Sequence, residues 1–129
     1  MATVSTGIGQ DSNFMNLKAI TESEIRQEVL GLLVGGEAVV AAFKSVRDQV
    51  IFTNKRIFVV NVQGVTGKKA SYFSYPYSKI QFYGIETAGL LDIDSELVVT
   101  FSNHHALKFD FKSNVDIKAI SQLISQYIL

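Results

Sequence analysis

The sequence contains no cysteine, which excludes disulfides, thiol nucleophiles and thiolate metal sites. It also lacks an excess of either charge, because 12 basic residues balance 12 acidic ones. A dedicated nucleic-acid binder carries a clear basic excess, so no nucleic-acid partner is expected. No apolar run approaches the roughly 20 residues of a membrane-spanning helix. The N-terminus lacks the basic start and apolar core of a signal peptide, so we expect a cytoplasmic protein.

The chain of 129 residues has the length of one ordinary domain with one sizeable core. Residues 3–13 are rich in Ser, Gly and Thr, which predicts a flexible N-terminal arm over 1–16, followed by a single domain over 17–129. Thr21 and Glu24 stand at the spacing of a capping box, and a one-sided apolar pattern follows them. This combination predicts a helix over 21–34, which ends at two glycines.

Short β-branched and aromatic runs then alternate with turn residues about every ten positions, which is typical of a sandwich or barrel. Seven strands are expected, over residues 37–46, 48–53, 56–62, 69–75, 80–88, 96–101 and 106–112. The period returns to that of a helix over 114–129, with Ser113 or Asn114 as its N-cap and Asp116 at its positive end. The expected fold is therefore mainly β (α+β), an antiparallel barrel or sandwich with a C-terminal capping helix and an extra N-terminal helix.

The expected strand over 56–62 is apolar on both faces. Ile57 and Val59 point to one side, whereas the other side carries Phe58, Val60 and Val62. A sandwich strand normally shows one face to water, so something must cover the second face. Two alternatives remain open: the N-terminal helix of the same chain, or a second subunit for which these residues form an oligomer interface.

No motif in the sequence argues for catalysis, a metal or a cofactor. The stretch from Gly64 to Lys69 has the wrong spacing for a phosphate loop, and a strand follows it instead of a helix. The carboxylates of Asp92, Asp94 and Glu96 lack the glycine and glutamate of a calcium loop. His104 and His105 are adjacent, so on an extended chain they point to opposite faces and do not share an ion. Without a positioned nucleophile and base, the chain is not expected to be an enzyme.

Four basic residues lie in turns that the expected meander brings to one open end of the barrel, together with the two histidines. They are Lys44, Arg47, Lys68 and Lys69. The opposite end is expected to carry Asp92 and Asp94. Such a basic rim offers a site for a phosphate or an anionic headgroup, and the alternative is a set of solvated turn charges.

The order of a helix, seven antiparallel strands and a closing helix resembles the pleckstrin-homology (PH) superfold. Within it, the sequence resembles the bacterial PH domain family, formerly listed as a domain of unknown function. This resemblance covers residues 17–129 and rests on the run from Asp48 to Ile57, the glycine turn 64–69, the stretch 75–77 and the stretch 86–89. It implies a PH-like barrel without catalytic activity and a tendency to form ring-shaped homo-oligomers. It does not imply phosphoinositide binding, because the second arginine of the lipid-binding pattern is absent after Arg47.

Two functions follow as hypotheses. The first is a self-assembling, non-catalytic interaction module that binds protein partners. The second is a module that makes weak contact with anionic membranes or phosphate ligands through the basic rim.

Overall fold

The computed structural model of the protein describes residues 11–87, 94–102, 105–112 and 115–129. Its strands form one eight-stranded sheet in the order β5-β4-β3-β2-β1-β8-β7-β6. The strands are β1 (Asp11–Ala19), β2 (Val39–Lys44), β3 (Gln49–Thr53), β4 (Arg56–Gln63), β5 (Lys69–Pro76), β6 (Phe82–Thr87), β7 (Ser95–Thr100) and β8 (Ala106–Phe111). The helices are α1 (Gln27–Leu30) and α2 (Ile117–Ile128), with short 3₁₀ turns η1 (Glu22–Glu24) and η2 (Tyr77–Lys79).

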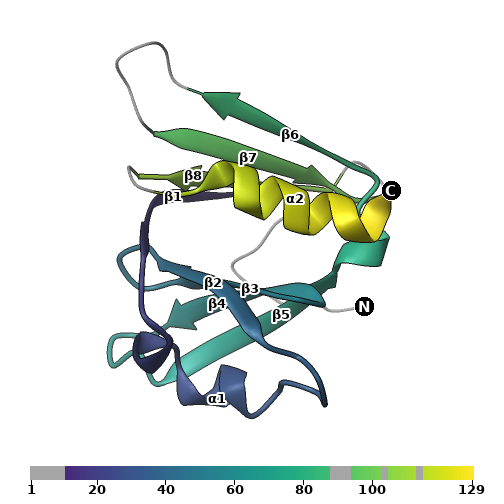
Figure 1. The fold of residues 1–129 in the computed structure, drawn as a ribbon. Helices are drawn as coiled ribbons and strands as arrows, with labels where there is room; N and C mark the ends of the chain where they lie inside the picture. Colours follow the sequence, from purple (N-terminus) through teal and green to yellow (C-terminus); the bar gives the residue numbers. More distant parts are fainter. Residues whose placement is uncertain (1–10, 88–93, 103–104, 113–114) are drawn as a thin grey trace, which may run out of the picture.

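The sheet curls into two halves that face each other (Figure 1). The upper half contains β6, β7, β8 and the start of β1, and α2 lies along its open side. The lower half contains β2 to β5, and α1 lies beneath it, on the side away from α2. The inner side of the curl therefore holds one core, and the outer side of the lower half holds a second.

Strand β1 joins the two halves because it pairs parallel with β8 and antiparallel with β2. A bulge between Phe14 and Leu17 interrupts its pairing with β8, and Asn16 adopts a φ of 58° there. Asparagine tolerates this left-handed conformation better than most residues, and a bulge bends the strand that carries it. The prediction of a flexible arm over 1–16 is thus wrong for residues 11–16, and residues 1–10 lie outside the described part.

The seven predicted strands are all present as β2 to β8, and the predicted first and last residues agree with the observed ones to within about two positions. Apolar and polar residues alternate along β8, and the apolar Leu107, Phe109 and Phe111 are fully buried. The C-terminal helix is also confirmed, but its N-cap is Asp116, whose Oδ1 accepts a hydrogen bond from the Ala119 N–H at 3.1 Å. The predicted caps Ser113 and Asn114 lie outside the described residues.

The inner core is built from aromatic rings that β1, β2, β3 and β8 contribute. Phe14 stacks on Phe109 with ring centroids 5.4 Å apart, and Phe43 lies 4.7 Å from Phe111. Ile120 and Ile124 of α2 close this core, and both are buried. Burying a large apolar side chain contributes about 1.5–3 kcal/mol, so these contacts hold the two halves together.

The predicted helix over 21–34 is wrong in its length, because the segment forms only η1 and the single turn α1. The capping contact at its start is present: the Thr21 N–H donates to Glu24 Oε2 at 2.8 Å. The backbone then becomes extended at Ile25 and Arg26. Here the side-chain amide of Gln49 forms hydrogen bonds with backbone groups that would otherwise bond within a helix. Its Oε1 accepts from the Arg26 N–H, and its Nε2 donates to the Glu24 carbonyl, both at 3.0 Å.

This N-terminal segment covers the outer face of the lower half. Ile25 and Val29 are buried against β2, β3 and β4 in a second apolar cluster. The cluster includes Phe58 and Val60, each at most 1% exposed, and Val62 packs half-buried at its border. The two apolar faces of β4 are confirmed, and the chain itself supplies the cover. Phe58 and Val60 are therefore not available as the predicted oligomer interface.

Candidate functional site

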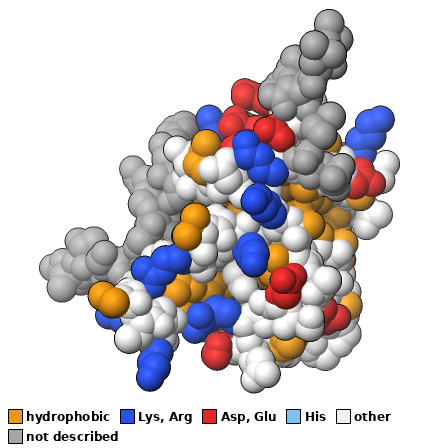
Figure 2. All heavy atoms as spheres, turned by 90° about the vertical axis from the view of Figure 1, so that its left-hand side faces the viewer, with side chains coloured by type: hydrophobic (Ala, Val, Ile, Leu, Met, Phe, Trp, Pro, Cys, Tyr) orange, Lys and Arg blue, Asp and Glu red, His pale blue; other side chains and the backbone are white. Residues whose placement is uncertain are grey.

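Three lysines converge on a depression between β8, β1 and β2, with a volume of about 520 Å³. Its lining consists of Asn16, Lys18, Lys44, Ser45, Val46 and Lys112. Figure 2 views this end of the molecule, which lies on the left in Figure 1. Basic side chains run down the middle of the face, and acidic ones gather above them. We call this hollow the lysine depression.

The sheet register brings the three lysines of the lysine depression together. Lys18 of β1 lies directly opposite Lys44 of β2 in the antiparallel pair. On the other side of β1, the Lys112 N–H donates to the Leu17 carbonyl at 2.9 Å. Lys112 therefore lies next to Lys18, just beyond the last paired residues of β1 and β8. The bulge at Asn16 bends β1 from β8 toward β2 and thereby sets this register.

The charges of the lysine depression are only partly balanced. Lys112 Nζ lies 3.1 Å from Asp94 Oδ2. Lys18 and Lys44 form no ion pair with any residue of the described ranges. Like charges directly opposite each other on neighbouring strands are destabilising, so this pair favours an anion from outside.

The predicted basic rim is divided between two places. The β2–β3 and β4–β5 turns do lie together, since the Arg47 guanidinium donates to the Gly64 carbonyl and Asp48 Oδ1 accepts from the Val62 N–H. Lys68 and Lys69 are exposed on the second turn. Lys44, in contrast, lines the lysine depression, whereas Arg47 lines a neighbouring hollow that shares part of its lining, namely Asn16, Ser45 and Val46. The four residues therefore do not form one site.

The predicted positions of His105 and Asp94 are wrong. His105 lies at the opposite end of the barrel, where its ring centroid is 6.0 Å from that of Tyr75. Asp94 lies at the basic end, paired with Lys112. The physical reason is that successive strands run in alternate directions, so β2, β4 and β6 all end at the basic side of the molecule and β7 ends at the opposite side (Figure 1). Asp92 and His104 lie outside the described residues.

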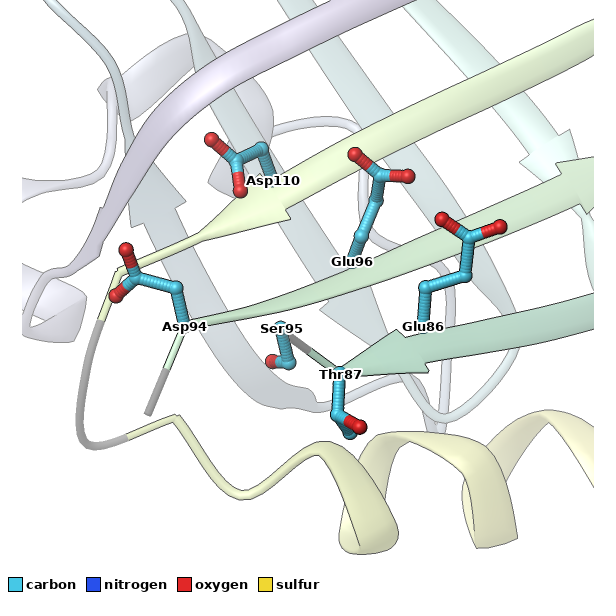
Figure 3. Close-up of a pocket in the computed structure, with 6 residues that line it drawn as sticks. All are labelled: Glu86, Thr87, Asp94, Ser95, Glu96 and Asp110. Atoms are coloured by element: carbon cyan, nitrogen blue, oxygen red, sulfur yellow. The ribbon is translucent and has the colours of Figure 1, made fainter. Parts of the chain in front are cut away.

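An acidic depression lies on the outer face of the upper half, with a volume of about 140 Å³ (Figure 3). Glu86, Glu96 and Asp110 are opposite one another across β6, β7 and β8. Their carboxylates point to the same side of the sheet, whereas Ser95 and Thr87 point to the other side. One lysine offsets part of this charge, with Lys108 Nζ 3.4 Å from Glu96 Oε1. Within the described ranges, no group of three or more acidic or histidine side chains is arranged to hold a metal ion.

The run from Thr53 to Arg56 has a structural role. Arg56 binds the carboxylate of Glu37 through two nitrogens, with Nη2 to Oε1 at 2.8 Å and Nε to Oε2 at 2.9 Å. Thr53 Oγ1 donates to Glu37 Oε2 at 2.6 Å, and Asn54 Oδ1 accepts from the Ala38 N–H at 2.9 Å. Burial alone would raise the pKa of Glu37, but the hydrogen bonds and charge of these partners lower it to about 2. The run thus fastens the β3–β4 turn to the N-terminal segment.

Two kinds of comparison agree on the family. A sequence profile described as the bacterial PH domain matches residues 9–128. The uncharacterized protein YjqA of Bacillus subtilis is 38% identical over 112 residues, which are 85% of this chain and 90% of YjqA. The chain belongs to the bacterial PH domain family.

Solved structures of bacterial PH domains are similar in fold. One is a protein with a pleckstrin-homology domain from Shewanella loihica, with a TM-score of 0.75 and 35% identity over 89% of this chain and 99% of that one. Another is a pleckstrin homology domain from Shewanella amazonensis, with a TM-score of 0.59 and 40% identity over 80% and 84% of the two chains. The fold and the family expected from the sequence are both confirmed.

Sequence reasoning missed two of the three residues that converge in this bacterial PH domain. Lys18 and Lys112 reach the lysine depression only because β1 lies between β2 and β8. Phe14 and Leu17 are buried apolar residues of β1, but the bulge between them sets them three positions apart, which hides the two-residue alternation of a strand. No helix in the described part of the domain has the length and apolar character needed to cross a membrane.

Proposed function

We propose that this bacterial PH domain is a non-catalytic interaction module that self-assembles head to tail, β6 of one copy pairing with β5 of the next. The resulting homo-oligomer would present its surfaces to protein partners in several copies. Strands β5 and β6 are the two ends of the sheet, so among the described residues each has one edge without a neighbouring strand. Exposed strand edges pair readily with another chain.

The observation that carries the proposal is the unprotected character of β6. Phe82 is 60% exposed and Ile85 is 37% exposed on this strand. Natural edge strands are usually protected by charged side chains (lysine above all), proline or a bulge, and β6 has the charge of Glu86 near its end but no lysine, proline or bulge. Edge strand β5, by comparison, begins with Lys69 and ends with Pro76. An edge without protection is best explained by a partner strand that covers it.

The charges at the two edges are complementary. Glu86 lies near the end of β6, next to Glu96 in the acidic depression, and Lys69 is the first residue of β5. Both ends lie on the same side of the molecule (Figure 1). An antiparallel pairing of β6 with β5 of another copy therefore brings Glu86 close to Lys69. Such head-to-tail pairing uses two different surfaces, so it closes into a ring or grows into a filament.

Light scattering over a range of concentrations tests the proposal, using the wild type and a Phe82→Lys, Gly84→Lys double variant. Both positions are exposed, and a Cβ at Gly84 meets no atom within 4 Å, so the variant should fold. We expect a discrete multimer for the wild type and a monomer for the variant. The matched control is Leu129→Lys, at a residue that is 98% exposed and belongs to neither edge strand, which should leave the multimer intact.

A charge exchange provides a second test. Glu86→Lys should weaken assembly, and adding Lys69→Glu should restore it, because the ion pair is then rebuilt with reversed signs. The first change places a lysine opposite Glu96, so loss of folding is not the expected cause of dissociation. A wild-type monomer at every concentration, or a multimer that neither β6 variant disturbs, would contradict the proposal.

A further inference from the structure

We infer that the lysine depression is a binding site for a phosphate-type anion with more than one negative charge. This inference concerns a different surface from the proposed assembly edges. It begins with the cross-strand pair of Lys18 and Lys44, whose register holds two positive charges at neighbouring positions. Opposite residues on antiparallel strands have Cβ atoms about 4.5–5.5 Å apart, so the side chains can reach one ion together.

The third lysine completes a group on one side of β1. Lys112 lines the same depression and already lies 3.1 Å from a carboxylate oxygen of Asp94. This contact shows that an anionic oxygen is accommodated at the edge of the depression. Each lysine ammonium offers three N–H donors and no acceptor, so the group is suited to a ligand with several acceptor oxygens.

The shape of the depression also favours such a ligand. Its volume of about 520 Å³ leaves room for a phosphate group with attached waters, since one water occupies about 30 Å³ in the liquid. Asn16 and Ser45 add an amide and a hydroxyl to the lining. Asn16 stands at the bulge of β1, where its backbone adopts a φ of 58°.

The whole chain has a formal net charge of zero, whereas a nucleic-acid-binding protein usually has an excess of basic residues. Binding along a polyanion needs many basic contacts over an extended surface, whereas three lysines in one hollow favour a compact anion. Phosphate esters in solution and phosphate headgroups of lipids share this chemistry. The site differs from the basic rim predicted from the sequence, because it is built on β1 and contains neither Arg47 nor Lys68 and Lys69.

The test uses inorganic pyrophosphate and, separately, phosphatidylcholine vesicles with and without phosphatidylglycerol. Calorimetry measures the first and co-sedimentation the second, both at low ionic strength. The variant is Lys18→Gln, Lys44→Gln, which removes the repelling pair and should not destabilise the fold. The matched control is Lys68→Gln, Lys69→Gln, which removes the same charge from the neighbouring turn. We expect the first variant to lose about tenfold or more in affinity and the control to stay within about twofold.

Each result has a defined meaning. Pyrophosphate binding without vesicle binding assigns the site to soluble phosphates, and binding to phosphatidylglycerol vesicles assigns it to a lipid headgroup. Absence of saturable binding to both probes would overturn the inference, as would equal losses in the two variants, which indicate only the general charge of this end. Repeating the titration with the Phe82→Lys, Gly84→Lys variant separates this result from self-assembly, whose success or failure is measured by the solution mass.

Discussion

Replacing Glu37 by glutamine removes the negative charge from a carboxylate whose side chain is fully buried beside Arg56. The pKa of Glu37 falls from an ordinary value of 4.5 to about 2 in the folded protein. One pKa unit corresponds to 1.36 kcal/mol, so the ionised carboxylate contributes about 3 kcal/mol to the free energy of unfolding at neutral pH. The variant should lose about this amount, because Arg56 then keeps its buried contacts without a counter-charge.

The sign of the pH dependence follows from the direction of the shift. Because folding lowers the pKa of Glu37, its contribution is complete above about pH 4.5 and is lost as the pH falls toward 2. The wild-type and Glu37→Gln unfolding free energies should therefore differ most at pH 7 and converge as the pH falls below 4.5. Urea unfolding followed by circular dichroism at a series of pH values measures both quantities.

The control for this experiment is Glu22→Gln, at an exposed carboxylate on η1. A surface change of this kind should shift the unfolding free energy by at most about 0.5 kcal/mol. The reasoning is refuted if Glu37→Gln costs less than about 1 kcal/mol at pH 7, or if its cost is the same at pH 7 and pH 3.

Two smaller predictions concern single contacts. Gln49→Leu removes both hydrogen bonds between β3 and the N-terminal segment, so it should destabilise the fold by about 1–3 kcal/mol, and hydrogen exchange should speed up first at Arg26. A normal exchange rate at that amide would count against the role given to Gln49. Asp116→Ala removes the N-cap of α2 and should cost about 0.5–2 kcal/mol in urea unfolding, whereas Asp116→Asn should restore most of it. If the asparagine variant is no more stable than the alanine variant, the capping contact is not the source of the effect.

Local chemistry accounts for the parts of the fold that could be predicted. The hairpins follow from turn residues that need no distant partner, such as Gly64 and Gly67, which both adopt positive φ. The helical period over 114–129 is equally local, and the C-terminal helix predicted from it is present as α2. The capping box at Thr21 was also correct, but the length of the helix after it was not. The helix does not continue through Ile25 and Arg26 because the backbone there bonds to the side chain of Gln49, which lies on β3 and not in the segment 21–34.

Long-range pairing accounts for the parts that could not be predicted. β1 is polar, bulged and weak in intrinsic strand preference, so only its two neighbours in the sheet make it a strand. The lysine depression depends on that placement, because Lys18 and Lys112 lie at opposite ends of the sequence. The two apolar faces of β4 likewise indicated that something must pack on the second face of the strand. They did not indicate whether it is the N-terminal segment or a second subunit. The burial of Phe58 under Ile25 and Val29 supplies that answer.

The parallel pairing of β1 with β8 has a consequence for how the chain folds. The first described strand finds its partner only after nearly the whole sequence has been synthesised, since Asp11 pairs with Ala106. Strands β2 to β5 form a local meander that can fold early, whereas joining the two halves through β1 closes a very long loop, which is slow. Until that step is complete, the edge of β1 that β8 later covers is open to other chains. Nascent chains on the ribosome would therefore be most exposed to aggregation just before β8 emerges.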